Sequence, residues 1–205
     1  MRGGNGVDGA IFIWFVWMGV VITVFFQKPS LERTGSAFLM LVAICVVNKT
    51  VTLMGISVAV LLVLAYVCGY LLWIKNGVRT VYAMILLIML TAAYTSIQLF
   101  AIYDPVFTYL YTKWSVAAIL FIIIHLTLNG FAERCSLLIL SIVHGEVILT
   151  IIFRGMGFER TAGELASFDV MAISIMATWI WSSFVKLTVH LEKTVKKHQE
   201  RRGYS

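Results

Sequence analysis

The sequence predicts an all-α bundle of about seven transmembrane helices, without a separate soluble domain. Of its 205 residues, 60% are hydrophobic and only 13% are charged, whereas soluble domains are typically about 45–50% apolar and about 25% charged. A chain this short cannot bury so much apolar surface in a core of its own, because small domains keep a large surface. Long apolar runs alternate with short polar turns along the chain. We therefore expect lipid to surround most of it.

Seven apolar runs mark the predicted spans. They are residues 10–26, 34–47, 51–74, 81–103, 115–128, 135–153 and 165–187, followed by a basic tail at 188–205. The first run ends at Phe26 without the small-residue cleavage pattern of a signal peptide, so we expect a retained span. Pro29 ends this helix, because proline has no backbone donor and clashes with the preceding turn.

The second run is short for a full crossing. Its fourteen residues reach about 21 Å at 1.5 Å per residue, whereas the hydrocarbon core is about 30 Å thick. Two alternatives are open: the helix continues through Asn48 and Lys49, with the Lys49 ammonium reaching the interface, or the segment is re-entrant. The third run, residues 51–74, is long enough to cross with tilt.

Polar residues mark parts of the later spans. Tyr94 and Gln98 are four residues apart in the fourth span and share one helix face. Polar side chains in a span usually hydrogen-bond to neighbouring helices. The fifth span contains His125, and Asp169 lies one turn inside the seventh, where we expect it at the membrane interface. Residues 154–164 form the longest loop.

The distribution of Lys and Arg predicts the orientation. With seven spans and the N-terminus outside, the inner segments carry eleven of these residues and the outer segments five, and cytoplasmic loops carry the excess. We therefore expect N-out and C-in, with the tail at 188–205 in the cytoplasm, where it is a candidate contact for anionic lipid. If the second run is re-entrant, six full spans place both termini inside.

The sixth span, residues 135–153, carries a histidine and a carboxylate near its centre. An ionisable group at that depth costs about 2.5–3.5 kcal/mol on insertion scales unless it is paired. Because successive helix residues turn by about 100°, Glu146 and His144 face different neighbours, and Gly145 between them lets another helix approach closely. The candidate intramembrane polar site consists of Glu146, His144, His125, Tyr94 and Gln98.

No catalytic, metal or cofactor site is predicted. The sequence contains no GxSxG nucleophile elbow, no HExxH zinc motif and no GxxxxGK[ST] phosphate loop. Cys45, Cys68 and Cys135 lie in or beside apolar runs without CxxC spacing, so we expect neither a disulfide framework nor a zinc site. The net charge of +6 sits largely in the last twenty residues, and orientation explains it without nucleic-acid binding.

Two function classes remain open. One is a non-enzymatic membrane component that binds partner helices, a second copy of itself, or lipid. The other is a small transporter or channel in which Glu146 and His144 act with the face that carries Tyr94 and Gln98. A polar cavity reaching Glu146 would favour transport, and a dry bundle with Glu146 bonded to a neighbouring hydroxyl would favour the structural role.

The chain opens with the aromatic run Phe12-Ile13-Trp14-Phe15-Val16-Trp17, and its first turn contains Glu32-Arg33-Thr34. Together with chain length and span count, these residues resemble the YphA-like proteins, which are small polytopic membrane proteins of Bacillus-type bacteria. The resemblance covers the whole chain. It implies a location in the bacterial cytoplasmic membrane, and it implies no catalytic, cofactor-binding or metal-binding residue.

Overall fold

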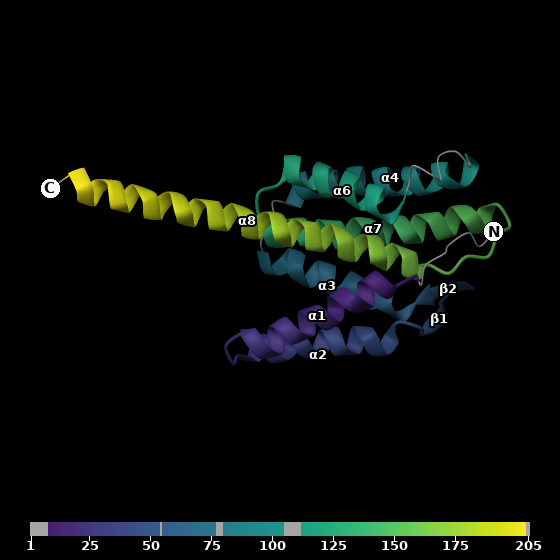
Figure 1. The fold of residues 1–205 in the computed structure, drawn as a ribbon. Helices are drawn as coiled ribbons and strands as arrows, with labels where there is room; N and C mark the ends of the chain where they lie inside the picture. Colours follow the sequence, from purple (N-terminus) through teal and green to yellow (C-terminus); the bar gives the residue numbers. More distant parts are fainter. Residues whose placement is uncertain (1–7, 54, 77–79, 105–111, 204–205) are drawn as a thin grey trace.

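A computed structural model describes residues 8–53, 55–76, 80–104 and 112–203. These ranges form seven α-helices and one two-stranded sheet. The elements in order are α1 (Ala10–Phe26), α2 (Leu31–Val46), β1 (Thr50–Leu53), β2 (Ile56–Ala59), α3 (Val60–Asn76), α4 (Thr80–Tyr103), α6 (Lys113–Thr127), α7 (Phe131–Gly155) and α8 (Leu165–Gly203). The helices form an elongated bundle, and the C-terminal half of α8 extends beyond it (Figure 1). The described chain is predominantly helical, as predicted.

Three of the described helices are long and apolar enough to cross a membrane without help from neighbours. Their apolar segments are Val81–Ala101, Phe131–Gly155 and Leu165–Lys193. Three further apolar helices, α1, α3 and α6, are shorter, and α2 has 16 residues. A helix of 15 to 17 residues spans about 23–26 Å, so these elements are shorter than a typical hydrocarbon core of about 30 Å.

One end of the bundle, called here the hairpin end, contains the β1–β2 hairpin and the loop between α7 and α8. The two are joined, because the Ala162 amide donates to the Ser57 carbonyl at 2.8 Å. The Asp169 carboxylate near the start of α8 accepts from the Gly9 amide before α1 at 3.0 Å. It also lies 2.6 Å from the Lys113 ammonium at the start of α6. Helices α1, α6 and α8 therefore begin at this end.

The opposite end, called here the tail end, is defined by contacts between other helix termini. Lys75, at the end of α3, pairs with Glu32, at the start of α2, at 2.9 Å. The hydrogen bond and the positive charge of Lys75 lower the pKa of the Glu32 carboxyl. The Tyr82 hydroxyl of α4 donates to the Thr127 carbonyl at the end of α6. Successive described helices therefore run in alternating directions between the two ends.

Local sequence explains where two of the helices begin. Ser30 precedes α2, and its hydroxyl accepts from the Arg33 amide at 3.1 Å. Thr112 precedes α6 in the same way and accepts from the Ser115 amide at 3.4 Å. Serine and threonine are favoured at this position because they satisfy a backbone donor that the first helical turn leaves free. These two caps place the starts of α2 and α6 within three residues of the predicted spans.

The prediction of a continuous span over residues 51–74 is wrong for its first nine residues. Strands β1 and β2 pair antiparallel with Thr50 opposite Ala59, and α3 begins only at Val60. Gly55 takes a φ of 77° in the turn, which glycine adopts at no steric cost. Helix α2 ends at Val46, so the alternative in which this helix continues through Asn48 and Lys49 is wrong. Short apolar β-branched runs fit a strand and a span equally well.

Helix α7 is the centre of the bundle and packs against α3, α4 and α8. Its inward positions are fully buried, including Leu137, Leu138 and Ile142. The outer faces of the bundle are apolar as well: Ile88 of α4 is 69% exposed and Ile180 of α8 is 55% exposed. Large contiguous apolar surfaces are rare on soluble monomers. Core and exterior together therefore match a bundle surrounded by lipid.

Candidate functional site

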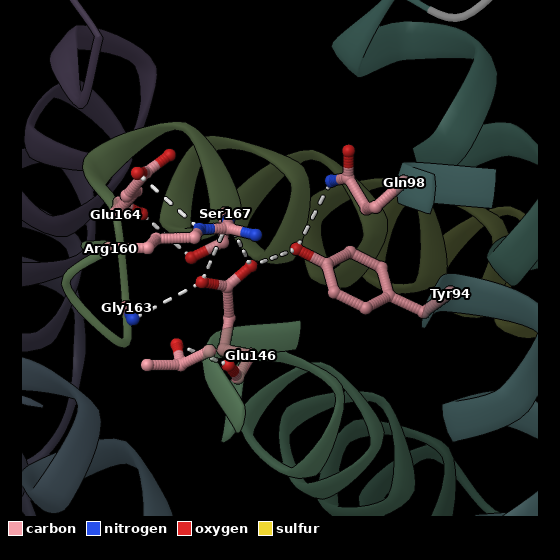
Figure 2. A network of polar contacts seen from close by, with 8 residues as sticks. Tyr94, Gln98, Glu146, Arg160, Gly163, Glu164 and Ser167 are labelled. Atoms are coloured by element: carbon pink, nitrogen blue, oxygen red, sulfur yellow. Dashed lines mark hydrogen bonds and ion pairs between the residues drawn. The ribbon is translucent and has the colours of Figure 1, made fainter. Parts of the chain in front are cut away.

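Glu146 lies in the second half of α7 and has no solvent-exposed surface. Its carboxylate lies between Tyr94 of α4 on one side and Arg160 and Gly163 of the loop that precedes α8 on the other (Figure 2). The Tyr94 hydroxyl donates to Oε1 at 2.7 Å. From the other side, the Gly163 amide donates to Oε2 at 3.1 Å. The prediction that other parts of the bundle shelter this carboxylate matches the observed contacts.

Arg160 supplies the positive charge. Its Nη2 atom lies 3.2 Å from both oxygens of Glu146, and its side chain is only 14% exposed. The guanidinium also lies 3.4 Å from the Glu164 carboxylate and stacks over the Phe153 ring, 5.4 Å from its centroid. A carboxylate offers about four acceptor positions, and the four contacts from Tyr94, Arg160 and Gly163 occupy them.

The close approach predicted at Gly145 is made by Tyr94. A Cβ atom added to Gly145 would lie 2.4 Å from Tyr94 Cδ1, so only glycine lets the tyrosine ring cross α7 at this level. Gln98 lies one turn further along α4, and its amide donates to the Tyr94 hydroxyl at 3.2 Å. The structure therefore brings three of the five predicted residues together: Glu146, Tyr94 and Gln98.

His144 faces a different neighbour, as the helical rotation predicts. Its Nδ1 donates to the Leu140 carbonyl at 2.6 Å. Its Nε2 lies 3.4 Å from the Tyr70 hydroxyl of α3, and the Tyr66 ring lies 5.8 Å away, centroid to centroid. This half-buried aromatic cluster is separate from the Glu146 network. A direct His144–Glu146 unit is not formed.

His125 is remote from both groups. Its Nδ1 donates to the Phe121 carbonyl of its own helix at 3.0 Å. Its ring lies tilted against the Phe121 ring at 4.0 Å and meets the Trp181 ring of α8 edge to face at 6.2 Å, centroid to centroid. The imidazole therefore packs between α6 and α8 and is not part of the candidate site. The prediction that grouped it with Glu146 is corrected on this point.

Sequence reasoning missed Arg160 and Gly163, which lie 14 and 17 residues beyond Glu146. The available signal was chemical. A carboxylate at membrane depth needs a cation, and the next loop carries two arginines, Arg154 and Arg160. Asp169, which the sequence places at the membrane interface, is fully buried among its neighbours and accepts from the amides at the start of α1; its depth in the membrane stays a prediction.

A polar cavity of about 480 Å³ opens at the hairpin end, beside this network. Ser57, Thr150, Arg154, Glu159, Arg160 and Thr161 are among its lining residues. Glu146 does not line the cavity, and Arg160 contacts both the cavity and the carboxylate. In the part of the chain that the structure describes, no group of three or more His, Cys, Asp or Glu side chains could hold a metal ion.

Comparison with known proteins identifies the family. The family described as "YphA-like integral membrane protein" matches residues 8–203. The chain is also similar to the protein named "Uncharacterized protein YphA" from Bacillus subtilis (strain 168), with 23% identity over 154 residues, which cover 75% of this chain and 73% of that protein. No solved structure matches the chain. The apolar helical bundle and the match over nearly its whole length agree, and the chain belongs to the YphA-like integral membrane proteins.

Proposed function

We propose that this protein is a non-enzymatic component of the bacterial cytoplasmic membrane that works by contacting partner helices, a second copy of itself, or lipid. The observation that carries this proposal is the closed set of contacts around Glu146. The carboxylate is fully buried, and donors from α4 and the α7–α8 loop hold it. A group that passes protons or ions must exchange its partners with water or substrate during each cycle.

A structural role explains the same contacts directly. The network ties α4 and the loop at 156–164 to the middle of the bundle, and buried hydrogen-bond networks favour one arrangement of the elements around them. The Gly163 amide donates to Glu146, while the adjacent Ala162 pairs with the hairpin. Glu146 therefore anchors the α7–α8 loop, and through it the β1–β2 hairpin, to the helices of the bundle.

We further propose seven crossings, with the N-terminus outside and the C-terminus in the cytoplasm. The alternating helix directions support this topology. So does the excess of Lys and Arg in the segments assigned to the inside. The shorter helices fit if the bilayer thins around them, at a modest cost per ångström. In this orientation the hairpin end faces outward, and the basic continuation of α8 meets the anionic inner leaflet.

The polar face of α4 favours a second candidate, a small transporter or channel. The Thr91 and Thr95 hydroxyls are buried on the face that carries Tyr94, and neither has a hydrogen-bond partner among the described residues. The polar cavity is lined by Arg160, and Arg160 is connected to this face through Glu146, which accepts from the Tyr94 hydroxyl. Such groups can line a path for water or ions. This path would require Arg160 to release Glu146.

Flux measurements in proteoliposomes distinguish the two candidates. The purified full-length protein is reconstituted with a pH-sensitive dye inside the vesicles, and a pH step is applied. We expect proton flux equal to that of protein-free vesicles for the wild type, Glu146→Gln and Arg160→Gln. Wild-type flux that Glu146→Gln abolishes would replace the proposed function with the transporter. In parallel, in-membrane crosslinking from lipid-facing positions of α4 should capture a second copy or a partner membrane protein.

A further inference from the structure

A second cavity, far more apolar than the first, runs along the bundle between the α1–α2 pair and helices α3, α7 and α8. Its volume is about 460 Å³, within the range of about 300–1,000 Å³ typical of ligand pockets. Phe12 and Phe168 line it near the hairpin end, and Ile22 and Trp179 line it toward the tail end. This feature is called here the apolar groove. It is separate from the Glu146 network.

The groove exists because α1 and α2 pack on each other and reach the rest of the bundle mainly through α1 and α8. Four methionines line it: Met18, Met40, Met171 and Met176. Methionine side chains are flexible and polarizable, and they adapt to irregular or variable apolar ligands. Thr23 is among the few lining residues with a polar side-chain atom. The apolar lining residues therefore favour a hydrocarbon ligand.

The length of the groove distinguishes an acyl chain from a helix. Its lining residues on α1 run from Phe12 to Thr23 and those on α8 from Phe168 to Trp179, which is about 17 Å along each axis at 1.5 Å per residue. Half of a hydrocarbon core of about 30 Å is about 15 Å. A transmembrane partner helix would need a contact surface across the full core, so the groove matches the acyl chains of one leaflet.

Charge at the tail end indicates the headgroup. The α8 residues in the groove recur at helical spacing, and Lys186, seven residues after Trp179, continues the same stripe. Lys28 follows the end of α1 and is exposed. The Arg33 guanidinium donates to the Val24 carbonyl at 2.8 Å, which places its charge beside the last groove residues of α1. The nearby Glu32 is already paired with a lysine.

We propose that the apolar groove binds one anionic phospholipid, with its acyl chains along the groove and its phosphate at Lys28, Arg33 and Lys186. This inference rests on the proposed function as a lipid-contacting membrane component and names the ligand. The bound lipid links α1 and α2 to the rest of the bundle. It is a specific ligand, distinct from the lipids that cover the outer faces.

Native mass spectrometry of the full-length protein tests the proposal with phosphatidylglycerol and phosphatidylcholine as probes. We expect one tightly bound phosphatidylglycerol, favoured over phosphatidylcholine by about tenfold or more. Ala172→Trp and Ala65→Trp fill the groove from α8 and from α3, and both should abolish this binding. Ala177→Trp is the matched control, because Ala177 does not line the groove. Gel filtration and circular dichroism identify variants that fold.

Two further readouts locate the lipid. A phosphatidylglycerol with a diazirine on its acyl chain should label peptides of α1, α2 and α8 saturably, and unlabelled phosphatidylglycerol should compete. The combined Lys28→Gln, Arg33→Gln and Lys186→Gln variant should lose the preference for the anionic lipid. Retained binding in a folded groove-filling variant, or equal labelling of the outer face of α4, overturns the proposal. Proton flux in liposomes would overturn the proposed function instead and leave these lipid readouts unchanged.

Discussion

Removing the Glu146 carboxylate should destabilise the protein more than removing an uncharged hydrogen-bond donor such as the Tyr94 hydroxyl. In Glu146→Ala the Arg160 guanidinium, 14% exposed, loses its buried partner. Breaking a buried ion pair from one side costs about 3–5 kcal/mol. A single hydrogen bond between membrane helices averages only about 0.6 kcal/mol. The ion pair therefore dominates, and we expect Glu146→Ala to lower the free energy of unfolding by about 3–5 kcal/mol.

Three further variants separate the contributions of the Glu146 charge and of its hydrogen bonds to the free energy of unfolding. Glu146→Gln keeps the shape and one acceptor oxygen but loses the charge, so the expected cost is about 1.5–3 kcal/mol, the range for hydrogen bonds to charged groups. Tyr94→Phe removes one hydrogen bond and should cost about 0.6 kcal/mol, with an upper limit near 1.7. Thr150→Val is the control, because that hydroxyl donates only to the Glu146 backbone carbonyl, at 2.8 Å.

Reversible unfolding in mixed micelles, titrated with dodecyl sulfate and followed by circular dichroism, measures these differences. A double-mutant cycle between Glu146→Ala and Arg160→Ala should give a favourable coupling energy. Arg160→Ala leaves the buried carboxylate without a cation, and Glu146→Ala leaves Arg160 with only the more exposed Glu164 carboxylate. A Glu146→Ala variant as stable as the wild type would refute the reasoning. So would a Tyr94→Phe variant that loses as much stability as Glu146→Ala.

Two other predictions follow from the packing. Gly145→Ala places a Cβ atom 2.4 Å from the Tyr94 ring, and it should lower the free energy of unfolding by about 1–3 kcal/mol in the same titration. Gly155→Ala is the control, because a Cβ atom there has nothing within 4 Å, and it should not destabilise the protein. Equal effects of the two variants would contradict the close helix crossing. Asp169→Asn weakens the contacts to the start of α1 and to Lys113, so amide hydrogen exchange should accelerate in α1 and stay unchanged in α7; uniform acceleration would argue against a local clamp.

Sequence alone predicts the helices and the face of the central carboxylate. The long apolar runs around residues 81–103 and 135–153 correspond to α4 and α7, because a helix of that length satisfies its own backbone in lipid. The rotation of about 100° per residue separates His144 from Glu146, and the structure places them against different helices. The small residue between them predicts the close helix contact that Tyr94 makes.

The hairpin and the loop contacts could not be predicted in this way. Residues 51–59 are apolar and β-branched, so composition does not distinguish a short strand pair from the start of a span. The pairing of Ala162 with Ser57 and of Arg160 with Glu146 depends on how a loop folds back on the bundle. His125 was grouped with Glu146 by residue type, but helix packing turns it toward α8. Tertiary geometry, which local pattern does not encode, decides all three.

A high-resolution structure of the full-length protein in lipid nanodiscs would show whether neighbouring helices and the α7–α8 loop shelter the Glu146 carboxylate inside a bundle surrounded by lipid. We predict that the Glu146 carboxylate contacts the Tyr94 hydroxyl, the Arg160 guanidinium and the Gly163 amide, with lipid against the outer faces and no continuous water path past the carboxylate. A carboxylate that faces lipid, or one that lines a water-filled passage through the bundle, would contradict it.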